Sequence, residues 1–123
     1  MKIEVSVGEI VDKLSILNIK KDNILDKSKL NNIINEFDYL YPIVFEHLLV
    51  EQEDFYSLLN INKKLWEIED EIRLLENSKK FDDEFIELAR SVYITNDKRA
   101  EIKKYINLKY GSIFTEEKSY EKY

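Results

Sequence analysis

Two pairs of carboxylates stand three positions apart in segments with helical periodicity. Glu9 and Asp12 form the first pair, and Glu67 and Asp70 form the second. Residues three apart share one face of a helix, so each pair can direct two oxygen atoms to the same place. Oxygen ligands projected in this way bind Mg²⁺ in helical-bundle enzymes. Because 36% of the residues are charged, such pairs also arise on solvated faces, and we predict no metal site from the spacing alone.

Arginine occurs only at Arg73, Arg90 and Arg99, in a chain rich in lysine. A planar guanidinium can bind a carboxylate or phosphate through two parallel hydrogen bonds, which a lysine ammonium cannot do. The three arginines are therefore candidates for specific contacts, either with carboxylates of the chain or with a small anionic ligand. Lysines of the N-terminal segment could complete a cage for such an anion, the candidates being Lys13, Lys20 and Lys21.

Several kinds of active site are excluded by the residue types. The chain has no cysteine, so it forms no disulfide, no thiolate nucleophile and no thiolate metal site. The single histidine, His47, belongs to no Ser-His-Asp arrangement, and we interpret it as a half-exposed packing residue. There is no glycine-rich phosphate loop. No cofactor is predicted, and the sequence leaves open whether the protein is an enzyme.

The elements that must position these residues are predicted to be helices. Ser6 and Glu9 match the S-x-x-E capping box, whose side chains satisfy free amides of a first helical turn. The apolar residues that follow recur at helical spacing: Val7, Ile10, Val11, Leu14, Leu17 and Ile24. This stripe resumes after a polar stretch at 26–29. We therefore predict one helical segment over 7–40, with a kink at that stretch.

Two further helical segments are predicted. Pro42 lacks a backbone N–H and biases Tyr41 away from helical angles, which predicts a break there and a segment over 43–77. Its apolar stripe keeps spacings of three and four: Phe55, Leu58, Ile61, Leu65, Ile68, Ile72 and Leu75. After a turn, Asp82 can cap a third segment over 82–110, and Gly111 can supply its left-handed C-terminal cap.

These segments predict an all-α fold, an antiparallel helical bundle of three to four helices built on a long helical hairpin. One helical domain spans 1–123, and 113–123 form a short tail that packs back on the bundle or docks on a partner. Two glycines and one proline leave few turn residues for a many-stranded β fold. The length lies within the usual range for one domain.

Folding the last two segments against each other brings polar residues together. Centring the turn near 78–81 gives the facing pairs Trp66 with Tyr93, Glu69 with Arg90, and Asn62 with Asp97. We also expect Arg73 to pair with Glu69, Asp70 or both along its own helix, and Arg90 to pair with Glu69 or Asp70 across the hairpin. The candidate polar cluster comprises Trp66, Glu69, Asp70, Arg73, Arg90, Asn96, Asp97 and Arg99. Such a layer either sets the register of the hairpin or binds a ligand.

Three segments resemble an uncharacterised domain family of bacteria and phages: MKIEVSVGEIVDKLSIL, LWEIEDEIR and LARSVYITNDKRAEIKKYIN. The resemblance covers nearly the whole chain and is loose between residues 25 and 55. It implies a helical domain with no assigned activity, so no catalytic residue is carried over. The pairing of LWEIED with the later NDKR is also similar to a second uncharacterised helical family, which directs attention to the cluster above.

Charge and hydropathy narrow the expected partners. Lys and Arg number 19 against 25 Asp and Glu, giving a net charge of -6, which disfavours nucleic acid. No stretch approaches the roughly 18 apolar residues of a membrane span, and the start lacks a signal-peptide pattern. We therefore expect a cytoplasmic protein without membrane contact. The long apolar stripes predict a homodimer or another protein partner.

Two functions are compatible with this sequence. The first is a small non-catalytic interaction or scaffolding protein. The alternative is a helical-bundle enzyme or binder that acts on a small anionic metabolite through Arg or Lys side chains and carboxylates, with Mg²⁺ dependence left open.

Overall fold

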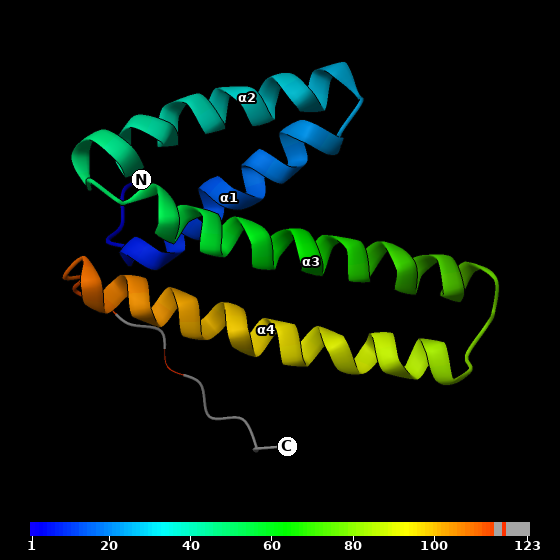
Figure 1. Ribbon diagram of the computed structural model, residues 1–123. Helices are drawn as coiled ribbons and strands as arrows, with labels where there is room; N and C mark the ends of the chain where they lie inside the picture. Colours follow the sequence, from blue (N-terminus) through cyan, green and yellow to red (C-terminus); the bar gives the residue numbers. More distant parts are fainter. Residues whose placement is uncertain (115–116, 118–123) are drawn as a thin grey trace.

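The computed structural model describes residues 1–114 and residue 117, and four α-helices account for most of them (Figure 1). The helices are α1 (Val7–Asn23), α2 (Lys27–Pro42), α3 (Gln52–Asn77) and α4 (Asp83–Lys109), and a π-helical turn, η1 (Ile43–His47), extends α2. No strand occurs in the described part of the chain. The predicted all-α fold is confirmed. Most of the predicted tail, 113–123, lies outside the described residues.

The predicted long hairpin is formed by α3 and α4, which lie side by side and antiparallel (Figure 1). Asp82 caps α4 as expected, because its side chain accepts a hydrogen bond from the Phe85 N–H at 3.4 Å. Gly111, with φ 64°, ends the helix in the left-handed conformation. The Ser112 N–H then donates to the Asn107 carbonyl at 2.9 Å, which satisfies one of the last helical carbonyls.

A second, shorter hairpin of α1 and α2 covers only one end of the α3–α4 hairpin (Figure 1). Ser6 caps α1, accepting a hydrogen bond from the Glu9 N–H at 3.2 Å. The prediction of one helical segment over 7–40 was wrong. Ile24 is extended, and Asp26 begins α2 by accepting a hydrogen bond from the Lys29 N–H at 3.0 Å. An aspartate cap satisfies an amide of a new first turn, and α2 folds back on α1.

Pro42 does not end its helix where we predicted. The helix continues through Pro42 into η1, and the chain leaves helical geometry only after His47. The turn after the proline is wider than an α-turn, since the Leu48 N–H donates to the Ile43 carbonyl five positions earlier, at 2.9 Å. Leu49, with φ 55°, then redirects the chain into α3.

The core lies at the end of the long hairpin that α1 covers. Its fully buried members are Val11, Leu14, Val44, Leu58 and Ile106. Farther along the hairpin burial decreases: Ile72 and Leu75 are only partly buried, and Leu74, Phe81 and Ile86 are exposed. The distal half of the hairpin is thus a two-helix arm, whereas the half beneath α1 holds the buried polar groups.

Candidate functional site

A buried ion pair joins the first helix to the last. Arg99 on α4 donates to both carboxylate oxygens of Asp12 on α1, with Nε 2.9 Å from Oδ1. Asn62 on α3 donates to the same Oδ1 at 2.9 Å and to the Ser15 hydroxyl at 2.7 Å. Ser15 in turn donates to the Asp12 backbone carbonyl at 2.7 Å. Three helices are therefore connected through the Asp12 side chain.

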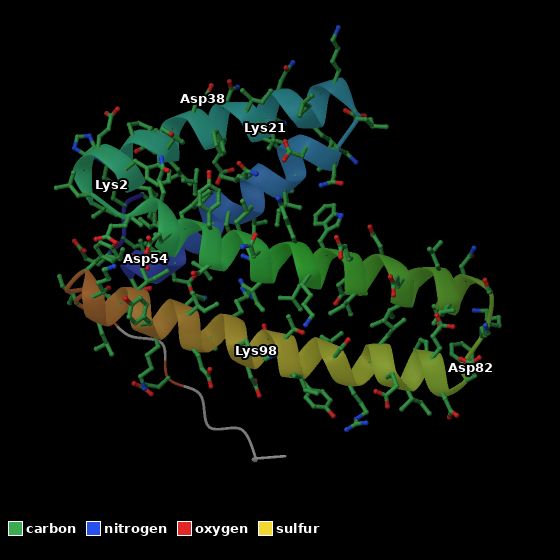
Figure 2. The ribbon with its side chains drawn as sticks, in the orientation of Figure 1. Lys2, Lys21, Asp38, Asp54, Asp82 and Lys98 are labelled. Atoms are coloured by element: carbon green, nitrogen blue, oxygen red, sulfur yellow. The ribbon has the colours of Figure 1, made fainter. Side chains whose placement is uncertain are left out.

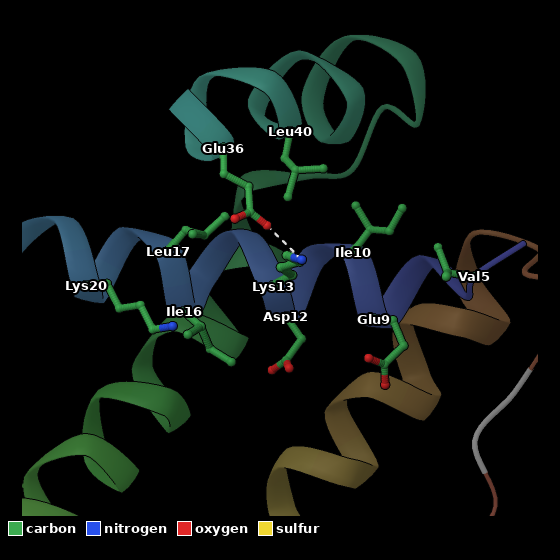
Figure 3. A pocket seen from close by; sticks show the side chains of 10 residues that line it. All are labelled: Val5, Glu9, Ile10, Asp12, Lys13, Ile16, Leu17, Lys20, Glu36 and Leu40. Atoms are coloured by element: carbon green, nitrogen blue, oxygen red, sulfur yellow. Dashed lines mark ion pairs between the residues drawn. The ribbon is translucent and has the colours of Figure 1, made fainter. Parts of the chain in front are cut away.

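A second pair lies one turn away on the same helices. Lys103 is buried on α4 and donates to the carboxylate of Glu9. The acids three apart on α1 therefore meet cations four apart on α4. Figure 3 shows both carboxylates on the side of α1 away from α2. The Glu9 and Asp12 oxygens are engaged by cations of the chain, which leaves them poorly suited to Mg²⁺.

The other carboxylate pair, Glu67 and Asp70, is exposed on α3. Across residues 1–114 and 117, no group of three or more His, Cys, Asp or Glu side chains could hold a metal ion. A site made of protein ligands alone needs several converging oxygen ligands, whereas Mg²⁺ is often held by one or two carboxylates together with water or substrate phosphates. Glu67 and Asp70 therefore belong to no such cluster within the described residues.

Five of the eight predicted cluster residues line one groove between α1, α3 and α4. This groove, of about 480 Å³, is lined by Ile16, Ile19, Asn62, Leu65, Trp66, Glu69, Asp70, Arg73 and Arg99. An adjoining hollow of about 310 Å³ shares Ile19, Trp66 and Asp70 with it and is also lined by Asp22, Asn23, Lys63 and Glu67. We call the two together the Trp66 groove. Its size suits a small ligand or a side chain.

The charges in the Trp66 groove are unevenly paired. Arg99 is engaged by Asp12, and Arg73 forms the predicted pair with Glu69 along α3, at 3.7 Å. The Asp70 carboxylate has neither an ion pair nor a hydrogen bond with any described residue. Apart from Arg99, which Asp12 engages, four acids and two bases line the groove. The acids are Asp22, Glu67, Glu69 and Asp70, and the bases are Lys63 and Arg73. The groove therefore carries excess negative charge.

Arg90 lies outside the groove, and its predicted contact across the hairpin is wrong. The Arg90 side chain is exposed and pairs with Glu87 on its own helix at 3.0 Å. Arg90 and Arg99 are nine positions apart, which at about 100° per residue places them on opposite sides of α4. Only the side that carries Arg99 faces α1.

Of the remaining two cluster residues, Asn96 contacts Arg99, whereas Asp97 lies on nearly the opposite side of α4. The Asn96 side-chain oxygen accepts a hydrogen bond from Arg99 at 3.4 Å, so Asn96 supports the guanidinium. Asp97 is half-buried on α4. The expected partner of Asp97, Asn62, donates instead to Asp12 and Ser15. Asn62 could have been identified from the sequence, because a lone amide in an apolar stripe indicates a buried polar partner.

Sequence reasoning missed a polar cluster where the start of α3 meets the end of α4 (Figure 2). Buried Asp54 accepts hydrogen bonds from the Lys109 ammonium, at 2.8 Å, and from the Tyr110 hydroxyl. The Tyr110 oxygen accepts from the Glu51 N–H at 2.8 Å. Burial raises the pKa of Asp54, but the bonds from Lys109 and Tyr110 outweigh it, so the pKa lies below its usual value. These contacts hold the start of α3 against the end of α4.

A further hollow, a cleft of about 510 Å³, lies between α1 and α2 (Figure 3). Its charged residues are largely paired. Lys13 meets Glu36 of α2 at 2.7 Å, and Glu9 and Asp12 are engaged by α4. Lys13 therefore belongs to a pair between helices, and Lys21 lies over the Phe37 ring at 4.2 Å. The cleft presents less unpaired charge than the Trp66 groove.

Among residues 1–114 and 117, none of the helices combines the length and the apolar character that a membrane-spanning segment needs. Comparison with known proteins agrees with the resemblance noted from the sequence. No match was found among curated proteins or among solved structures. One family model matches residues 1–123, that is, the full length of the sequence. The chain therefore belongs to the family of unknown function DUF6165.

Proposed function

We propose that this chain is a non-catalytic interaction domain whose Trp66 groove receives a cationic side chain of a partner protein. The observation that supports this proposal is the position of Asp70, a carboxylate without a partner among the described residues, in a groove that also contains half-buried Trp66. A carboxylate attracts an ammonium or guanidinium group, and an indole face binds the same cations. Leu65 and Ile19 can contact the apolar stem of a lysine or arginine.

The internal pairing of three acids that hold the helices together supports a non-catalytic role. Asp12 is engaged by Arg99, Glu9 by Lys103, and Asp54 by Lys109. A general acid, a general base or a nucleophile needs a lone pair or proton within reach of a substrate. Groups that are committed to holding helices together serve poorly in that role.

The openness of the groove supports a protein partner over a free small molecule. The Arg73 side chain is 78% exposed and that of Glu69 is 47% exposed. Sites for small molecules usually enclose most of the ligand surface. A side chain carried by a larger surface needs no such enclosure, because neighbouring contacts contribute to the binding energy. Exposed Leu74, which lies four positions after Asp70, offers one such apolar contact.

The alternative, a small anionic metabolite, remains a prediction with less support from the geometry. Such an anion would contact Arg73 and Arg99, and it would have to compete with Glu69 and Asp12 for them. A thermal-shift screen with carboxylate and phosphate metabolites, with and without Mg²⁺, tests this alternative. A ligand at about 100 times its Kd stabilises the folded state by about 2.7 kcal/mol.

Fluorescence tests the proposed function, because Trp66 is the only tryptophan of the chain. Short peptides that carry one lysine or arginine between leucines are expected to change the emission saturably. Matched peptides with glutamine or glutamate at that position are expected to have little effect. Asp70→Asn should weaken binding about fivefold, since an exposed charge pair contributes up to about 1 kcal/mol. Glu71→Gln, at the next position of α3, is the matched control and should bind like the wild type.

Two outcomes would count against this proposal. The first is an equal response to the lysine and glutamate peptides, which would mean that the groove does not select for positive charge. The second is unchanged binding by Asp70→Asn. A simple alkylamine that binds as tightly as the lysine peptide would instead assign the groove to free amines.

A further inference from the structure

The side of α4 that faces away from α1 carries exposed apolar residues. Ile86 is 51% exposed, Tyr93 44%, Tyr105 55% and Leu108 70%. At about 100° per residue, the four fall within an arc of about 120°, centred opposite Arg99. Arg90, Asp97 and Glu101 lie in the same arc, between these apolar residues. From Ile86 to Leu108 the face is roughly 33 Å long, given a rise of about 1.5 Å per residue. We call this surface the outer face of α4.

Charge is divided between the two ends of α4. Positions 82–90 contain four acids and one base, and positions 97–109 contain five bases and two acids, Asp97 and Glu101. Three of the five bases are engaged by acids of α1 and α3, namely Arg99, Lys103 and Lys109. The other two, Lys98 and Lys104, are exposed. Asp83 and Glu87 are exposed at the acidic end.

We infer that two copies of this chain associate through the outer face of α4, with the two helices antiparallel. An antiparallel arrangement brings the acidic end of each helix to the basic end of the other. With Ile86 opposite Tyr105 of the second copy, Glu87 lies opposite Lys104, and Tyr93 lies opposite Lys98. A two-fold axis makes every such contact twice. A parallel arrangement would oppose like charges at both ends.

The existing contacts of these side chains permit this association. Glu87 pairs with Arg90 at 3.0 Å, and Lys104 pairs with Glu117 at 3.4 Å. Arg90 also interacts with the Tyr93 hydroxyl on the same face. Both pairs are exposed, and exposed pairs contribute little and exchange partners readily. The outer face and the Trp66 groove lie on different sides of α4. The association is therefore independent of the proposed function, and either can fail without the other.

Sedimentation equilibrium of the full chain measures this association directly. At roughly 100 µM the mass is expected to approach twice the 14.8 kDa of one chain. The dimer should weaken as salt is raised from about 0.05 M to about 1 M, because exposed charges are screened. A mass of 14.8 kDa at the highest concentration would overturn the inference.

Charge reversal distinguishes the antiparallel arrangement from other dimers. One variant combines Asp83→Lys with Glu87→Lys, and a second combines Lys98→Glu with Lys104→Glu. Each variant alone should sediment as a monomer, since like charges then meet at both ends of the interface. An equal mixture of the two should recover the dimer mass, because opposite charges then meet between position 87 of one copy and position 104 of the other, in both directions. A dimer that both reversals leave intact would also overturn the inference.

Two controls keep these measurements interpretable. Glu53→Lys combined with Glu76→Lys changes the net charge as much as the first variant does, but on exposed positions of α3, and should remain dimeric. Circular dichroism verifies that each variant keeps its helix content. If a charge-reversal variant loses helix content, the variant that combines Ile86→Ser with Leu108→Ser is used in its place. This variant leaves the net charge unchanged and should raise the dimer Kd at least tenfold. Unchanged dimerisation of that variant would equally contradict the inference.

Discussion

The Asp12 carboxylate accepts two hydrogen bonds from the Arg99 guanidinium, although 87 positions separate the two residues in the sequence. Only 5% of the Asp12 side chain and 26% of the Arg99 side chain are exposed. Asn62 and Ser15 complete the network around them. Removing one partner of such a pair leaves the other charge buried without compensation, so the pair should be needed for stability.

Arg99→Ala should lower the free energy of unfolding by about 3 kcal/mol, the lower end of the range for breaking a buried pair. Urea denaturation measures this loss. Arg90→Ala is the matched control, because Arg90 forms an exposed pair with Glu87 and its removal should cost less than about 1 kcal/mol. Similar losses in the two variants would show that the Asp12 pair is not a structural contact.

Gly8 should tolerate no side chain, because it lies against the backbone of α4. Its N–H donates to the Asn107 side-chain oxygen at 2.6 Å, and an added Cβ would lie 2.8 Å from the Lys103 carbonyl oxygen. Gly8→Ala must therefore push α1 away from α4, at a cost of about 1 to 3 kcal/mol. Gly111→Ala is the comparison, with free space around the added Cβ and a penalty of about 1 kcal/mol from its left-handed φ. Calorimetry should rank the Tm loss of Gly8→Ala above that of Gly111→Ala.

Helix ends were predictable where the signal and its partner lie within one turn. Ser6, Asp82 and Gly111 each act on backbone groups a few positions away, so their sequence context was sufficient. Asp26 is also a capping residue, but the apolar stripe continues on both sides of it. Whether α1 ends there is decided by how α1 and α2 pack together and on α3, which the pattern alone does not contain.

The candidate site was predictable only in part, for a similar reason. Residues Trp66 to Arg73 share one helix, so their proximity followed from helical spacing. Arg99 joins them because α4 turns that side toward α1, whereas Arg90 is on the opposite side. The partner of Arg99, Asp12, is on a helix whose placement depends on tertiary packing. Asp12 and Glu9 are three positions apart on α1, and Arg99 and Lys103 are four positions apart on α4. This matching of acids and bases is a signal that could have indicated the pairing of the two helices.

The contacts of Asp54 should make stability depend on pH. Its folded-state pKa is lowered, so the stabilisation is present above the unfolded pKa near 4 and is lost as pH falls through the lower folded value. Asp54→Asn should therefore flatten the acid side of a plot of urea midpoint against pH. Glu53→Gln, at the preceding and exposed position, should leave the acid side as steep as in the wild type.

The same cluster predicts a loss of stability at alkaline pH. Burial and the bond to Asp54 raise the pKa of Tyr110, so its stabilisation is present below the unfolded pKa near 10 and is lost as pH rises through the folded value. The urea midpoint of Tyr110→Phe should change less than that of the wild type between about pH 9 and about pH 12. A wild-type midpoint that is constant over this range would contradict the assignment.

Collisional quenching of Trp66 should reveal the sign of the charge in the groove. Carboxylates outnumber cations around the indole, so Cs⁺ should accumulate there and I⁻ should be depleted. After normalisation to the neutral quencher acrylamide, we expect Cs⁺ to quench about twice as efficiently as I⁻ at low salt, with the difference vanishing as salt screens the field. Asp70→Asn combined with Glu67→Gln should bring the two ions close to equality, whereas Glu71→Gln should have a smaller effect. If I⁻ instead quenches Trp66 more efficiently than Cs⁺ after normalisation, the charge around the indole is positive. That result would support an anionic ligand.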